Sequence, residues 1–211
     1  MDLIWFPTGG GKTEAYLGLT SFTIFLRKLT SKNEKGCAVL MRYTLRLLTT
    51  QQFQRAASLI CACEKIRQDN QKILGDERIS LGLWIGKESS PNKEKEARDI
   101  LEEFIRNPND SSKNKFVLLN CPWCSYDFIP KEGKPKAYKI LGKKKQFHYV
   151  CPNKLCHFSI DQNTLPITVI DERIYLEPPT LLIGTIDKFA SVTWLSEAIG
   201  MFDKFSKPDL I

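Results

Sequence analysis

Short apolar segments alternate with longer segments of helical periodicity along much of this chain. Before residue 110 a predicted strand is followed by a predicted helix three times: residues 3–6 and 13–29, 37–41 and 45–67, and 79–85 and 93–106. The first helix is apolar almost all round, which predicts that it is buried. The third is amphipathic. Alternating strands and helices predict an α/β fold in which helices cover both faces of a parallel sheet.

The second half of the chain contains an interruption of this pattern. Residues 107–115 are predicted to form a loop, and a cysteine-bearing segment follows. A strand at 180–184, a helix at 187–200 and the beginning of another strand at 208–211 then resume the pattern. We therefore expect one α/β domain with a small insertion, divided as residues 1–115, 116–164 and 165–211.

The length of 211 residues is enough for one sizeable domain, or for one domain with a small insertion. No apolar run is long enough to span a bilayer, and the N-terminus has no signal-peptide pattern. We expect a cytoplasmic protein with no membrane partner. The net charge of +7 is concentrated at residues 131–145, which hold seven lysines and one glutamate. This basic run is either a solvated hairpin or a contact for a polyanion such as nucleic acid.

A glycine-rich loop lies between the first predicted strand and helix. Its sequence is Phe-Pro-Thr-Gly-Gly-Gly-Lys-Thr, from residue 6 to residue 13. Glycines let backbone N–H groups turn toward phosphates, a lysine supplies charge to the outer phosphates, and the threonine hydroxyl is placed to ligate Mg²⁺. The predicted nucleotide-binding residues are Thr8, Gly9, Gly10, Gly11, Lys12 and Thr13, of which Lys12 and Thr13 are the catalytic candidates. Phe6 replaces the first glycine of the full pattern, and the alternative is a chance glycine turn.

Four cysteines form two short pairs separated by 26 residues. They are Cys121, Cys124, Cys151 and Cys156. Two such pairs suit tetrahedral Zn²⁺ in a small ribbon, and the alternatives are buried thiols or redox pairs. His148 and His157 flank the second pair and could replace a cysteine as ligand. The other three cysteines (Cys37, Cys61 and Cys63) are interpreted as structural.

Two further segments resemble motifs of superfamily-2 helicases. Residues 44–51 resemble motif Ia, with Arg46 at the place of its arginine, and residues 184–189 resemble motif Ib. The stretches FPTGGGKTEAYLGL, VLMRYTLRLLTTQQFQRA, CPWC and PPTLLIGTIDKFA together resemble the helicase subunits of bacterial DISARM anti-phage systems. The resemblance covers nearly the whole chain.

This resemblance implies the first RecA-like motor domain of an ATP-dependent helicase or translocase. It implies ATP, Mg²⁺ held through Thr13, Zn²⁺ in the insertion, and a nucleic-acid partner that is DNA rather than RNA. Other implied partners are the remaining helicase domains of the same polypeptide and other defence-system subunits. The residues implied to hold the nucleic-acid backbone are Arg46, Thr185 and Lys188. Lys143, Lys144 and Lys145 are predicted to contact phosphates, with Tyr138, Phe147 and Tyr149 stacking on bases.

The acidic motif II of such helicases is expected after Ile211, so these 211 residues alone are expected not to hydrolyse ATP. Residues 169–173, which include Asp171 and Glu172, compete for that assignment. They precede the motif-Ib segment and are interpreted instead as a surface strand near the insertion. The alternative function is a zinc-ribbon nucleic-acid-binding module on an inactive P-loop scaffold.

Overall fold

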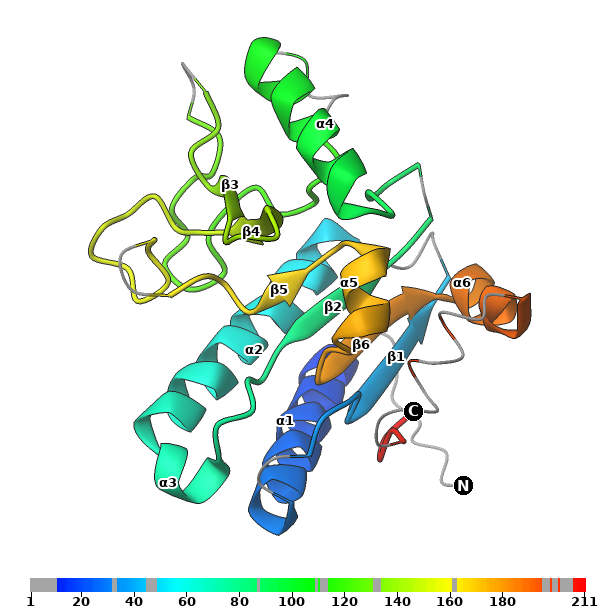
Figure 1. Cartoon of the computed structure of the whole chain (residues 1–211). Coiled ribbons are helices and arrows are strands. Elements are labelled where there is room, and N and C mark those ends of the chain that lie inside the picture. The colour runs from blue at the N-terminus through cyan, green and yellow to red at the C-terminus, as the bar shows by residue number, and fades with distance from the viewer. Residues whose placement is uncertain are drawn as a thin grey trace.

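A parallel four-stranded sheet forms the centre of the computed structural model (Figure 1). Its order is β1 (Val39–Tyr43), β6 (Leu181–Thr185), β2 (Leu81–Trp84) and β5 (Ile167–Thr168). All three strand pairs are parallel, which confirms the predicted α/β class. The residues that the structure describes are 11–31, 34–44, 49–86, 88–108, 110, 114–130, 134–160, 163–194, 198, 201 and 207–211.

Helices follow the described strands largely as predicted, and the predicted strand at residues 3–6 lies outside the described residues. They are α1 (Lys12–Thr30), α2 (Thr50–Asp69), α3 (Gln71–Leu74), α4 (Glu94–Arg106), α5 (Asp171–Leu176) and α6 (Ile186–Ala190), with a 3₁₀ turn at Ser191–Trp194. The predicted start of α2 was too early, because Thr49 caps this helix in a reciprocal capping box with Gln52. The predicted helix at 187–200 is broken by the 3₁₀ turn, and residues 195–197, 199 and 200 lie outside the described part.

Alternate residues of the strands point to opposite faces of the sheet and build two separate cores. In β6, Ile183 packs into the larger core with α1 and α2, whereas Leu182 packs into the smaller core with Ile174 of α5. In β1 the same alternation separates Val39 from Leu40. Helices therefore lie on both faces, as the alternating sequence pattern predicted.

The interpretation of residues 169–173 as a surface strand was wrong. Strand β5 ends at Thr168, Val169 and Ile170 are buried, and α5 begins at Asp171. The segment is thus a strand-to-helix connection at the edge of the main sheet. Its apolar residues face the interior rather than solvent.

The insertion packs onto the sheet domain rather than standing apart from it. Its hairpin of β3 (Tyr138–Leu141) and β4 (Gln146–Tyr149) is antiparallel and lies beside α4 (Figure 1). Phe116, Phe128 and Tyr149 of the insertion are fully buried in the same core that contains α1, α2 and β6. One continuous core therefore supports both units.

Residues 209–211 run beside β1, as predicted for the start of a strand. The N–H of Leu40 donates to the carbonyl of Leu210 at 2.9 Å, and Val39 and Leu210 form a parallel bridge. Among the described residues, no helix is long and apolar enough to cross a membrane.

Candidate metal centre and nucleotide loop

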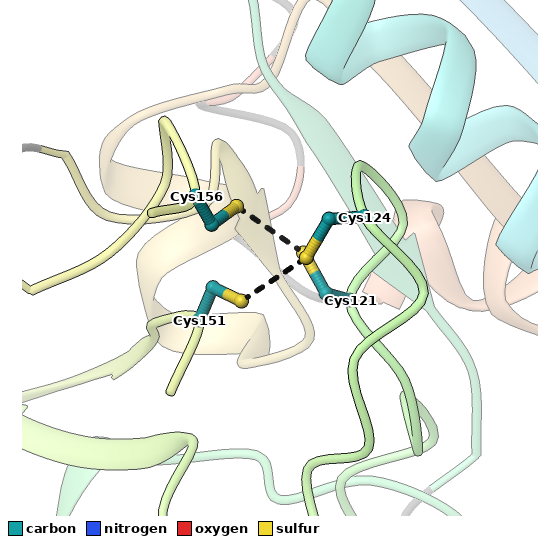
Figure 2. A group of neighbouring side chains, drawn as sticks. All are labelled: Cys121, Cys124, Cys151 and Cys156. Carbon is teal, nitrogen blue, oxygen red and sulfur yellow. Dashed lines mark hydrogen bonds between the residues drawn. The ribbon is translucent and has the colours of Figure 1, made fainter. Parts of the chain in front are cut away.

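The four paired cysteines come together at one point of the insertion (Figure 2). Their sulfur atoms all lie within 4.8 Å of one another. Cys121 and Cys156 are separated by 3.9 Å between sulfurs, and Cys124 and Cys151 by 3.5 Å. Tetrahedral Zn²⁺ with bonds of about 2.3 Å to sulfur requires sulfurs roughly 3.8 Å apart. The donor set and its spacing therefore fit a closed four-thiolate metal site.

Tight turns fix the two cysteine pairs. The carbonyl of Cys121 accepts from the N–H of Ser125, whose φ of 60° lies in the left-handed region. In the second pair, the Cys156 N–H donates to the Asn153 carbonyl at 2.9 Å, and the Phe158 N–H points at the Cys156 sulfur. The Phe158 N–H stabilises the thiolate of Cys156 more than its thiol, as a metal ligand requires.

Burial opposes ionisation of three of the four thiols. It raises the pKa of Cys121 to about 12, and it also raises the pKa values of Cys151 and Cys156. At Cys124 burial is outweighed by hydrogen bonds, first from the Tyr126 backbone, and its pKa is lowered. At neutral pH three thiols thus retain protons, which a dication must displace.

Neither neighbouring histidine belongs to this metal group. His157 Nε2 lies 2.7 Å from Oε1 of Gln68 on α2. His148 lies on β4, where burial lowers its pKa to about 4, and it lines a cleft of about 390 Å³ at the amino ends of the strands. The three remaining cysteines are buried in the two cores, as interpreted from the sequence.

The described part of the predicted nucleotide loop lies at the start of α1. Thr8, Gly9 and Gly10 lie outside the described residues. Gly11 caps α1 with a φ of 75°, a conformation that glycine adopts without strain, and Lys12 and Thr13 form the first turn. Thr13 lines a small pocket with Tyr43 and Ile183, near the carboxyl ends of β1 and β6. This is the edge at which parallel α/β sheets bind ligands.

The predicted nucleic-acid contacts fall into three different environments. Arg46 lies outside the described residues. Thr185 is buried at the end of β6, and Lys188 ion-pairs with Asp171 at 2.5 Å. Lys143, Lys144 and Lys145 are exposed on the β3–β4 turn, where Gly142 and Lys145 both adopt positive φ.

The prediction that Tyr138, Phe147 and Tyr149 stack on bases was wrong. All three are buried among aromatic rings of the insertion core. The hydroxyls of Tyr138 and Tyr149 donate to the carbonyls of Leu118 and Phe116. The aromatic residues alternate with polar residues along the hairpin strands, and this alternation indicates the buried face of the hairpin rather than a surface for bases.

Asp171 lies on the opposite side of the sheet from Thr13. Its carboxylate pairs with Lys188, whose ammonium lies 5.9 Å from the centre of the Trp84 ring. Trp84 belongs to the α5 core, whereas Ile183 beside Thr13 belongs to the α1 and α2 core. Asp171 and Thr13 therefore lie beside different faces of the sheet.

One residue that connects three elements of the structure was not identified from the sequence. Glu94 at the start of α4 ion-pairs with Arg173 of α5 and accepts the N–H of Phe147 at 2.8 Å. It therefore joins α4, α5 and the insertion hairpin. No local pattern distinguishes it from the other acidic residues of α4.

Fold and site together define an α/β protein that carries a candidate four-cysteine metal centre in an insertion. No protein-family model matches the chain. It is 34% identical, over 227 aligned positions and 98% of its length, to the DISARM protein DrmA of Bacillus paralicheniformis. This identity supports a DrmA-like relationship. The chain spans about a fifth (19%) of the length of that relative.

Metal content tests the cysteine cluster. Protein purified without chelator should carry about one equivalent of Zn²⁺ when assayed by elemental analysis, as a closed four-ligand site does. The Cys121→Ser/Cys124→Ser variant should lose it, because two of four ligands are gone. Cys63→Ser, which removes a buried thiol outside the cluster, should retain it. Protein without zinc would contradict the assignment.

The pH dependence of zinc affinity should follow from the raised thiol pKa values. Metal binding must release the protons of Cys121, Cys151 and Cys156, so affinity is weaker in acid and rises with pH. Between pH 6 and 8 we expect at least a tenfold gain per pH unit, measured by competition with a chromogenic chelator. An affinity that does not change over this range would show that the thiols ionise without metal.

Proposed function

We propose that this chain is the first RecA-like domain of an ATP-dependent superfamily-2 helicase or translocase that acts on DNA in bacterial anti-phage defence. The observation that carries the proposal is the Gly11-Lys12-Thr13 turn. It opens α1 at the carboxyl ends of β1 and β6, in a chain that is 34% identical to a DISARM protein.

The proposed chemistry of this loop follows from its residues. Lys12 would hold the outer phosphates of ATP, and the Thr13 hydroxyl would ligate Mg²⁺, which neutralises charge on the transferred phosphate. Glu14, the next residue, ion-pairs with Arg55 of α2. This exposed pair links the first turn of α1 to α2.

The proposed nucleic-acid contacts are Arg46, Thr185 and Lys188 on the motor domain, with Lys143, Lys144 and Lys145 on the insertion. Lys188 would exchange the Asp171 carboxylate for a phosphate of the nucleic acid. Gly184 lets α6 pack closely against the end of β6, because a Cβ there would lie 2.8 Å from the Phe189 ring of α6. The remaining helicase domains of the same polypeptide and other defence subunits complete the proposed cytoplasmic assembly.

A second candidate is a zinc-ribbon nucleic-acid-binding module on an inactive P-loop scaffold. The exposed lysine turn between the two cysteine pairs favours it. This module would need the metal site and the lysines but not Lys12. ATP turnover therefore separates the two functions.

Lys12→Ala in the longer polypeptide should reduce ATP hydrolysis at least 100-fold, because the outer phosphates lose their fixed charge. Phosphate release is the measurement, and Lys95→Ala on the exposed face of α4 is the control. Normal turnover in Lys12→Ala would contradict the proposed role of the loop.

Asp171→Asn tests the competing acidic motif in the same assay. Loss of hydrolysis with an unchanged thermal midpoint would assign the catalytic carboxylates to residues 171 and 172 instead.

Replacing Lys143, Lys144 and Lys145 with alanine should weaken nucleic-acid binding evenly across sequences, because phosphate contacts carry no base information. The slope of log affinity against log salt should flatten by roughly one unit for each phosphate that a lysine no longer neutralises. Fluorescence anisotropy between 50 and 200 mM salt measures both. Alanine at Lys35, Lys93 and Lys95 removes the same charge elsewhere, and an equal effect of that control would show only a general charge effect.

A further inference from the structure

Helix α1 exposes a regular apolar stripe. The exposed residues follow one another at spacings of four, three, four and three along the helix: Ala15, Leu19, Phe22, Leu26 and Leu29. Phe22 is 63% exposed, Leu26 49% and Leu29 58%. The sequence predicted that α1 is buried all round. Within the described part of the chain this prediction holds for only one face.

The polarity of this helix is the reverse of that of a solvated surface helix. Residues 15–26 contain no acidic or basic side chain. Arg27 and Lys28 point inward, where Arg27 pairs with Asp209 and Lys28 donates to the Glu77 carbonyl at 2.7 Å. Leucines beside them point outward. Helix α4 of the same chain, in contrast, buries Ala97, Leu101 and Phe104 and exposes charged residues.

Spacing of four and three residues is the pattern by which one helix accepts the side chains of another. From Ala15 to Leu29 the stripe runs about 21 Å, or about four turns. Coiled-coil contacts between separate subunits carry charged residues beside the stripe to set partner choice. Here the positions beside the stripe are Tyr16, Gly18, Thr23 and Phe25, none of them charged, which resembles the surroundings of a helix inside one folded chain.

We propose that another helix of the same, longer polypeptide packs along this stripe. The DrmA relative is about five times as long as the matched region, which leaves ample chain to supply it. The partner helix should present an apolar seam over three to four turns and have few charges along its edges. Because α1 begins at Lys12, such packing would also support the nucleotide loop. The proposal depends on the DrmA relationship and not on ATP hydrolysis.

A photo-crosslinking amino acid, p-benzoylphenylalanine, placed at Phe22 of the longer polypeptide tests this directly. Mass spectrometry should identify an intramolecular crosslink to an apolar helical segment outside these 211 residues. The same probe at Lys95, exposed on α4, is the matched control. A crosslink within the 211 residues, to a second copy or to another protein, or a yield no higher than at Lys95, would overturn the proposal.

A charge in the stripe gives an independent test. Phe22→Lys/Leu26→Lys should lower the thermal midpoint of the longer polypeptide by at least about 3 °C, because two lysines must enter a packed contact. Leu155→Lys is the control, since Leu155 is 93% exposed outside the stripe. A midpoint changed no more than in this control would contradict packing at α1, whatever the ATPase activity of the variant.

Discussion

The structure depends on β6, whose backbone pairs in parallel with both β1 and β2. All five residues of this strand are buried, yet the chain reaches it only after α4 and the whole insertion. The N–H of Leu181 donates to the carbonyl of Ser80 at 2.9 Å, which closes this long excursion. A metal joining Cys121 to Cys156 would shorten the loop that folding has to close, and the shared core holds the insertion against the sheet. The cysteine cluster and the sheet therefore share one hydrophobic core.

Helix α2 contacts residues beside both candidate sites, the four-cysteine cluster and the predicted nucleotide loop. Near its start Arg55 pairs with Glu14 beside the nucleotide loop, and Gln54 donates to the carbonyl of Asn120 beside Cys121. Near its end Gln68 contacts His157. Glu64 and Arg67 form a buried pair on the same helix, and Glu64 also accepts the N–H of Ile79 ahead of β2. Helix α2 therefore contacts both the four-cysteine cluster and the first turn of α1 on one face of the sheet.

Structural features that depend on residues close together in the sequence were predictable. Helices α1 and α4 and strand β6 follow from periodicity, and the four-cysteine cluster follows from two short cysteine spacings. Features that depend on distant partners were not. The pair of Asp171 with Lys188, the burial of Tyr138 under the insertion and the short β5 arise from tertiary packing. The exposed side of α1 shows the same limit, because an apolar sequence predicts burial without indicating which face of the helix packs against its neighbours.

We propose that the glycine loop belongs to a motor that uses ATP and acts on nucleic acid. The most direct measurement is the rate of ATP hydrolysis by the longer polypeptide with and without single-stranded DNA. We expect hydrolysis that rises at least severalfold when DNA is added. DNA binding accompanied by no hydrolysis under either condition would contradict it, and would leave a metal-supported binding module as the function of this chain.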